Sequence, residues 1–194
     1  MSQYRVLDPG TLDSGTCFQR PHQNLPDHVT LDSPAMDIMT DLSRVTAEKV
    51  SPNAPVDDAE EQMIASGIRL LFVTNQLQQV IGIVTSKDLS GERILRFTKD
   101  TQSARKDVIV RDIMTPQHQI EILEMGDVAT ARVGDVVATL KRMGRQHALV
   151  IDRDASAHQT IRGLLSTTQI SRQLGETIDT GDVAGNFANL ARAG

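Results

Sequence analysis

Apolar and polar positions along the chain follow one order of elements that occurs twice. Residues 56–73 and 133–150 share a helical apolar stripe, then a glycine, then an apolar run. The glycines, Gly67 and Gly144, come directly after the stripe, where a left-handed backbone conformation commonly ends a helix. The pattern predicts two equivalent helices, each leading into a strand.

Two short apolar runs after each glycine predict a β-hairpin in each copy. The first hairpin is expected over 70–74 and 80–84, and the second over 148–151 and 161–165. The second loop is four residues longer, an insertion that a hairpin tip tolerates.

Two shorter blocks strengthen the case for an internal repeat. The tetrapeptide Asp-Ile-Met-Thr at 37–40 recurs 75 residues later at 112–115, and 82–85 matches 163–166 in type. Three blocks in the same order predict an α/β fold of tandem β-α-β-β-α repeats with pseudo-twofold symmetry.

The repeats divide the chain into four parts. Proline and glycine are frequent before residue 33, and small residues dominate after Glu176. We expect a linking helix over about 86–105 with Leu89, Ile94, Leu95 and Phe97 on its buried face. The predicted parts are an N-terminal arm or disordered tail (1–32), repeat 1 with the linking helix (33–105), repeat 2 (106–175) and a C-terminal tail (176–194).

Local signals also predict how the first long helix begins. Asp57 is expected to cap it and Glu60 to complete a capping box. Its apolar face is expected to contain Ala59, Met63 and Ile64.

Composition narrows the function. The 194 residues carry 20 basic and 25 acidic side chains, a net charge of −5, which argues against a general nucleic-acid or anionic-membrane binder. Cys17 is the single cysteine, so neither an intrachain disulfide nor a cysteine zinc site is expected. With no apolar stretch of about 18 residues and no apolar leader, we expect a soluble cytoplasmic protein.

The segment 82–88 carries the most chemistry. It is a strand that turns into a helix whose first turn offers a hydroxyl, a lysine and a carboxylate, from Thr85, Lys87 and Asp88. Such a turn suits a phosphate and a ribose diol. The same Thr-x-x-Asp spacing also fits a capping box that only satisfies backbone amides, and both interpretations stay open.

The second copy differs at this point. Ser166 to Gln169 keeps a capping pattern but replaces the carboxylate by an amide. We therefore expect capping to persist there and ribose binding to be weaker.

Other chemistry finds no support in the sequence. The five histidines lack the spacing of a helical metal site, and no nucleophile elbow or P-loop occurs. Arg93, Arg96 and Lys99 are expected on a solvated helix face. We predict no metal site and no enzymatic activity.

From about Ala35 to Gly175 the sequence resembles the cystathionine-β-synthase (CBS) domain family, in which two repeats pair into one module. Gly82, Thr85 and Asp88 match its Gly-x-x-Thr/Ser-x-x-Asp/Asn signature, and the two Asp-Ile-Met-Thr segments match the opening of each repeat. Gln169 departs from the signature, as do Phe72 and Leu149, which stand where many members have proline.

This resemblance implies a stand-alone module that binds AMP, ADP, ATP or S-adenosylmethionine in clefts between the repeats. It implies that Asp88 holds the ribose hydroxyls, Thr85 a phosphate, and Val45 and Thr46 the adenine. The full set of expected ligand-binding residues is Thr85, Asp88, Lys87, Val84, Ile83, Thr46 and Val45.

We therefore expect a regulatory adenosyl-ligand sensor with no required cofactor, which acts through a separate partner protein. A homodimer is expected because Met36 and Ile38 would expose apolar surface. The alternative is a dimerisation or scaffold module that binds no ligand, in which Thr85 and Asp88 only cap a helix.

Overall fold

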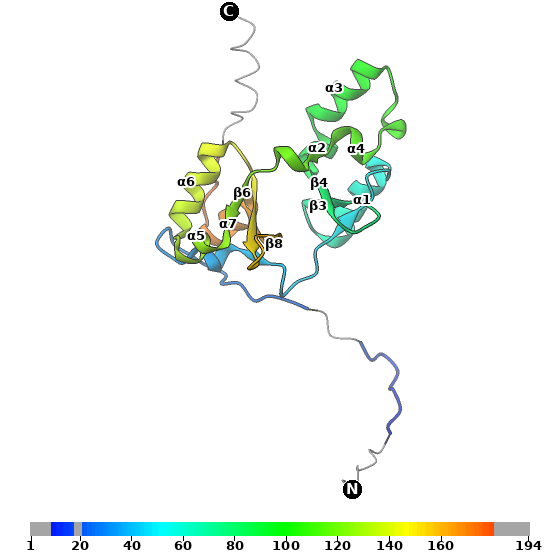
Figure 1. The fold of residues 1–194 in the computed structure, drawn as a ribbon. Helices are drawn as coiled ribbons and strands as arrows, with labels where there is room; N and C mark the ends of the chain where they lie inside the picture. Colours follow the sequence, from blue (N-terminus) through cyan, green and yellow to red (C-terminus); the bar gives the residue numbers. More distant parts are fainter. Residues whose placement is uncertain (1–8, 18–20, 181–194) are drawn as a thin grey trace, which may run out of the picture.

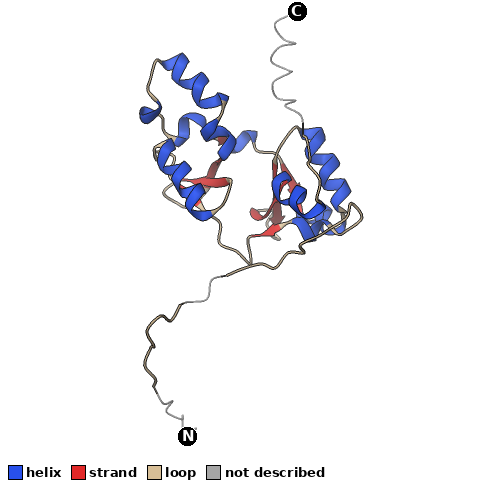
Figure 2. Ribbon diagram, turned by 180° about the vertical axis from the view of Figure 1, so that it is seen from behind, coloured by secondary structure: helices blue, strands red, loops and turns tan. Residues whose placement is uncertain are grey.

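Two four-stranded sheets form the centres of two lobes in the computed structural model, which describes residues 9–17 and 21–180. The strands lie on the inner sides of the lobes and the helices on the outer sides (Figures 1 and 2). Each lobe contains the long helix and the hairpin of one repeat, so the predicted α/β fold is confirmed.

The sheet of repeat 1 has the order β2-β3-β4-β5 and that of repeat 2 the order β1-β8-β7-β6. The strands are β1 (Thr40–Asp41), β2 (Lys49–Val50), β3 (Leu70–Thr74), β4 (Val80–Thr85), β5 (Thr115–Pro116), β6 (Ile122–Glu124), β7 (His147–Arg153) and β8 (Gln159–Ser166). The α-helices are α1 (Val56–Ser66), α2 (Ser86–Ser90), α3 (Glu92–Thr101), α4 (Val110–Ile113), α5 (Met125–Thr130), α6 (Val133–Met143) and α7 (Thr167–Leu174). Short 3-10 helices are η1 (Ala35–Ile38), η2 (Arg105–Asp107) and η3 (Gln117–Gln119).

Both hairpins and both long helices occur where the apolar pattern predicts them. The helices α1 and α6 end at Gly67 and Gly144, whose φ angles are 65° and 62°. These left-handed positions explain why glycine ends the stripe in each copy.

The sheet of each repeat is completed by a short strand from the start of the other repeat. β1 pairs with β8, and β5 pairs with β4. A Cβ on Gly163 would lie 2.6 Å from Met39 Sδ, and one on Gly82 would lie 2.8 Å from Met114 Sδ. The repeated glycines and methionines therefore fit one another across this exchange, because only glycine leaves room for the incoming sulfur.

This exchange removes the reason for which a homodimer was expected. Ile38 is fully buried in the core of repeat 2, and Met36 packs against the same core. The prediction that these side chains expose an uncovered apolar face is wrong, since the other repeat of the same chain covers them.

The start of α1 also differs from the prediction. The helix begins at Val56 with Pro55 before it, and no side-chain cap forms. Asp57 and Glu60 instead accept hydrogen bonds from Arg105, at 2.7 and 2.5 Å. Ile64, expected on the buried face, is 75% exposed.

The expected linking helix is broken in two. Gly91 separates α2 from α3, and a Cβ at Gly91 would lie 2.4 Å from the carbonyl oxygen of Lys87. Beyond the break Ile94 is buried, but Leu95 is 70% exposed, so only part of the predicted face packs.

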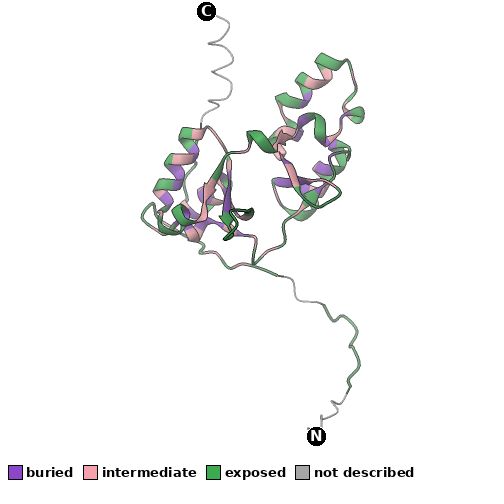
Figure 3. Cartoon of the chain, in the orientation of Figure 1, coloured by how far each residue is buried: buried purple, intermediate pink, exposed green. Residues whose placement is uncertain are grey.

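A third apolar cluster joins the two sheets. Leu70 and Phe72 of β3 are buried together with Leu149 of β7. Side chains from β4 and β8 pack around them, among them Ile83 and Leu164. The inner faces of both sheets therefore contribute to one core (Figure 3).

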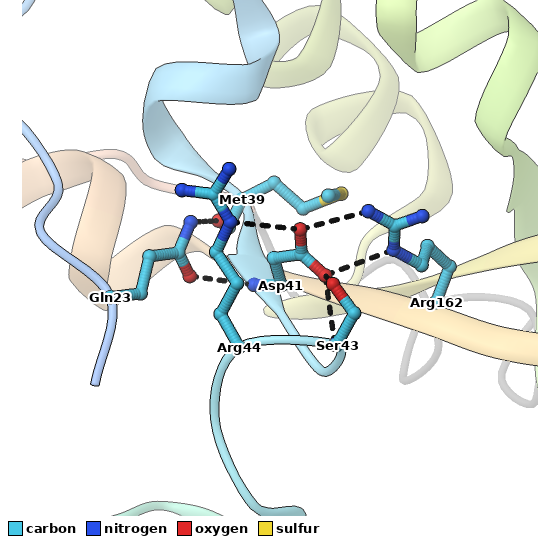
Figure 4. A network of polar contacts seen from close by, with 6 residues as sticks. All are labelled: Gln23, Met39, Asp41, Ser43, Arg44 and Arg162. Atoms are coloured by element: carbon cyan, nitrogen blue, oxygen red, sulfur yellow. Dashed lines mark hydrogen bonds and ion pairs between the residues drawn. The ribbon is translucent and has the colours of Figure 1, made fainter. Parts of the chain in front are cut away.

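A buried carboxylate fixes β1 to repeat 2. Asp41 is 3% exposed and accepts two hydrogen bonds from Arg162, at 2.9 and 3.0 Å. These bonds hold the pKa of Asp41 well below its ordinary value, against the opposing effect of burial, with help from Ser43. Figure 4 shows Arg44 and Gln23 on its other side.

Part of the N-terminal arm packs on repeat 2. Gln23 bonds the backbone of Met39 and Asp41, and Val29 packs against the core of repeat 2. Residues 9–17 are exposed, including Cys17. Among the described residues, no helix has the length and apolar character needed to cross a membrane.

Candidate functional site

The turn that joins β4 to α2 contains the two central residues of the predicted site. β4 ends at Thr85, which is antiparallel to Leu70 of β3, and α2 starts at Ser86. The backbone N–H of Ser86 donates to the carbonyl oxygen of Arg69 at 3.0 Å, which closes the turn onto the neighbouring strand.

Thr85 and Asp88 bond each other reciprocally. Asp88 Oδ2 accepts from the backbone N–H and the hydroxyl of Thr85, at 2.9 and 2.7 Å. The backbone N–H of Asp88 lies 3.4 Å from Thr85 Oγ1. The capping box that the Thr-x-x-Asp spacing predicts is therefore present.

The other oxygen of Asp88 faces a cation. Asp88 Oδ1 lies 3.2 Å from Arg93 Nη1, and the side chain of Asp88 is 15% exposed. A carboxylate offers about four lone-pair positions. Asp88 therefore keeps acceptor capacity on Oδ1 after its bonds within the turn.

The other predicted ligand residues differ in how they lie. Val84 is fully buried in the core of repeat 1. Ile83 packs between the sheets and is half-buried. Lys87 and Thr46 are exposed and Val45 is half-buried, the last two in the loop between β1 and β2.

The equivalent turn of repeat 2 lacks the capping box. Ser166 precedes α7 and makes no side-chain capping bond, so the prediction that capping persists there is wrong. Gln169 instead bonds within its own helix. Its Oε1 accepts from Arg172 at 2.6 Å, and its Nε2 donates to Gln173 at 3.1 Å.

Gln173 ties this helix to the N-terminal arm and to η1. It is 2% exposed, and its Nε2 donates to the carbonyl oxygens of Pro26 and Asp37, at 2.6 and 2.9 Å. Its own carbonyl oxygen accepts from the backbone N–H of Val29 at 3.0 Å. The second turn therefore supports packing of the chain's own segments.

One histidine lies between the two turns. His147 pairs with Ser166 across β7 and β8, and Asp88 and Arg69 of repeat 1 are close enough to influence its charge. Burial lowers the pKa of His147 to about 4, Asp88 opposes this, and Arg69 adds to it. His147 is therefore neutral at pH 7.

Sequence reasoning missed three residues around the turns. Arg93 is solvent-exposed as expected, with 43% of its side chain accessible, but it also contacts Asp88. Gln173 and His147 gave no periodic signal, and each becomes informative only when residues distant in sequence come together. Within 9–17 and 21–180, no group of three or more histidine, cysteine, aspartate or glutamate side chains could hold a metal ion.

The family comparison can now be set beside this geometry. Residues 35–93, which contain the complete turn, match the model of the CBS domain. The first repeat is a CBS domain. The second repeat has the same order of elements, and the chain thus has the fold of a CBS domain pair, which confirms the resemblance seen in the sequence.

Solved structures agree with this fold. An uncharacterised conserved protein from Pyrococcus horikoshii aligns with a TM-score of 0.52 at 20% identity, over 73% of this chain and 92% of that chain. A conserved CBS domain protein of unknown function from Thermoplasma acidophilum aligns with a TM-score of 0.50 at 18% identity, over 77% of each chain. CBSX2 in complex with AMP aligns at 0.49 and 22% identity, over 72% of this chain and 94% of that chain. No curated protein matches the sequence.

Proposed function

We propose that this CBS domain pair is a regulatory sensor that binds an adenosyl ligand, such as AMP, ADP, ATP or S-adenosylmethionine, at the Thr85–Asp88 turn. The observation that carries the proposal is the turn itself. It lies within the matched CBS domain, and its carboxylate is positioned by Thr85 while Oδ1 keeps acceptor capacity.

In this proposal Asp88 Oδ1 accepts hydrogen bonds from the ribose diol. The Thr85 hydroxyl, which donates to Asp88 Oδ2, turns toward a phosphate, while the backbone N–H of Thr85 keeps the carboxylate in place. Lys87 adds positive charge, Val45 and Thr46 enclose the adenine, and the backbone of Ile83 and Val84 forms the wall behind it.

We further propose that the protein is not an enzyme and acts through a separate partner protein in the cytoplasm. The net charge of −5 supports neither a nucleic-acid nor a membrane partner. A homodimer remains a prediction. Light scattering that finds a monomer at micromolar concentration would contradict it.

The alternative is a scaffold module that binds no adenosyl ligand. The capping box favours it, because both oxygens of Asp88 already have partners within the chain. In that case the turn only begins α2.

A thermal-shift screen separates the two functions. A ligand that binds only the folded state raises the melting temperature, and the rise grows with the logarithm of the ligand concentration above its Kd. We expect at least one of AMP, ADP, ATP and S-adenosylmethionine to raise it, and Asp88→Ala to abolish the shift.

The matched control is Asp135→Ala. Asp135 Oδ2 accepts from the backbone N–H of Arg132 at 2.9 Å at the start of α6, so this variant also removes an N-terminal helix carboxylate. It should keep the ligand shift. If none of the four ligands stabilises the wild type, the sensor function is wrong and the scaffold remains.

A further inference from the structure

Arg93 connects the candidate site to the segment that completes the sheet of repeat 1. Its Nη1 lies 3.2 Å from Asp88 Oδ1, donates to the carbonyl oxygen of Ile113 at 2.8 Å, and lies 3.2 Å from Thr115 Oγ1. Ile113 ends α4 and is 1% exposed in the core of repeat 1. One nitrogen thus contacts both the turn and the segment 110–116.

The three acceptors exceed what this nitrogen can satisfy. Nη1 carries two hydrogens, and Ile113, with the shortest contact, takes one. Thr115 Oγ1 accepts from the other at 3.2 Å, so Asp88 contacts this nitrogen as an ion-pair partner. A ligand group that occupies Asp88 Oδ1 would weaken the ion pair with Arg93, and the guanidinium could shift while it keeps its bonds to Ile113 and Thr115.

The segment 110–116 leads directly to repeat 2. Thr115 pairs with Ile83 in β4, two residues before Thr85, and the chain continues from β5 through η3 to β6. A shift of Arg93 at Thr115 therefore acts on the strand that leads into the turn and on the connection to the second sheet.

The break at Gly91 produces this arrangement in repeat 1 alone. In repeat 2, α7 runs without interruption from Thr167 to Leu174. The residue equivalent to Arg93, at the offset that relates Asp88 to Gln169, is Leu174, which packs against the core of repeat 2. Repeat 2 thus lacks both the carboxylate and the guanidinium.

We propose that Arg93 is a positioning residue that couples occupancy of the Thr85–Asp88 turn to the segment 110–116, through its ion pair with Asp88 and its hydrogen bonds to Ile113 and Thr115. This inference rests on the proposed adenosyl-ligand function. It assigns to repeat 1 both the binding of the ligand and the first step by which binding affects the rest of the protein.

Hydrogen-deuterium exchange of the full chain, with and without saturating AMP, tests the coupling. We expect AMP to change the exchange rate of amides in 110–116 by about threefold or more in the wild type. Arg93→Met should still bind AMP in calorimetry but lose this change. Arg93→Lys, which keeps the charge without the planar fork, should lose most of it and guards against misfolding of the first variant.

The control is Arg96→Met, which removes an exposed cation from the same helix and should behave as the wild type. The coupling is wrong if the wild type binds AMP without any change in 110–116, or if Arg93→Met binds AMP and keeps the change. If the wild type does not bind AMP in calorimetry, AMP sensing at the turn fails, and with it the coupling as proposed. The isotherm and the exchange data thus separate failure of the site from failure of the coupling.

Discussion

Thr85 and Ser166 occupy equivalent positions at the ends of β4 and β8, each three residues before a polar side chain that can accept hydrogen bonds. At the first turn Asp88 bonds back to Thr85. At the second, Gln169 bonds forward to Arg172 and Gln173. The equivalent turns thus carry different side chains. The carboxylate of repeat 1 is the proposed ligand acceptor, whereas the amide of repeat 2 bonds to residues of its own helix.

This difference teaches that a duplicated fold can divide its tasks between its copies. Repeat 2 uses its turn to hold η1 and the N-terminal arm through Gln173. In repeat 1 the carboxylate of the turn has one oxygen bonded to Thr85 and the other facing Arg93. We therefore expect one adenosyl site per chain, and four substitutions test this asymmetry.

The largest effect is expected from Asp88→Ala, because a charged acceptor of the ribose diol is lost. Loss of such a bond costs about 1.5–3 kcal/mol, or roughly one to two decades in affinity. Calorimetry with the ligand found in the thermal-shift screen measures this loss. Gln169→Ala is the matched control and should leave affinity within about twofold. Equal losses of affinity in both variants would contradict the expected difference between the two turns.

Gln173→Ala should lower the free energy of unfolding by about 2 kcal/mol, because it leaves the buried carbonyl oxygens of Pro26 and Asp37 without their donor. Urea unfolding followed by circular dichroism measures the change. The equivalent residue of repeat 1 is Glu92, which is exposed. Glu92→Ala should therefore change stability by less than about 0.5 kcal/mol. A stable Gln173→Ala protein would show that the second turn has no structural task.

His147→Leu should change how stability depends on pH, since Leu70 is the equivalent residue in repeat 1. The unfolded histidine binds a proton below about pH 6.5, whereas folded His147 stays neutral down to a pKa of about 4. The unfolded state thus binds more protons between these values, so wild-type stability rises with pH from about 4 to 6.5.

The variant should lose about 1 kcal/mol of this rise, less than the full shift implies because His147 is partly exposed. The difference between wild-type and variant unfolding curves from pH 4 to 7.5 isolates the histidine from the carboxylates. Parallel curves would contradict the prediction.

The smallest effect is expected from Gln169→Asp, which restores the signature of the family in repeat 2. An aspartate three residues after Ser166 can cap the backbone N–H of that residue, and we expect a stability gain of about 0.5 kcal/mol. Calorimetry should detect a second, weak adenosyl site. A second site as strong as the first would mean that the carboxylate alone decides binding and that the repeats are not otherwise different as ligand sites.

Much of the fold was predictable because short local patterns of the sequence determine its elements. Two short apolar runs in each copy predicted both hairpins, and Gly67 and Gly144 predicted the ends of the long helices. The pairing of Thr85 with Asp88 was likewise visible as a spacing of three.

The rest depends on contacts between distant parts of the chain. Ile38 appeared to be uncovered because its partner, the core of repeat 2, lies about a hundred residues later. Asp57 had the correct spacing for a cap, but Arg105 competes for it. The reciprocal bond from the Gln169 side chain back to Ser166 does not form because that side chain bonds to Arg172 and Gln173.

The exchange of strands between the repeats also determines how the chain can fold. Thr40 pairs with Leu164, so most of the chain must be synthesised before β1 meets its partner. Loops of this length close slowly because the entropy of the chain opposes them. Until then the side chains of Ile38 and Met39 lack the apolar core of repeat 2 that buries them in the folded protein. We therefore expect neither half to fold alone, and the late docking of β1 to limit the folding rate of the intact chain.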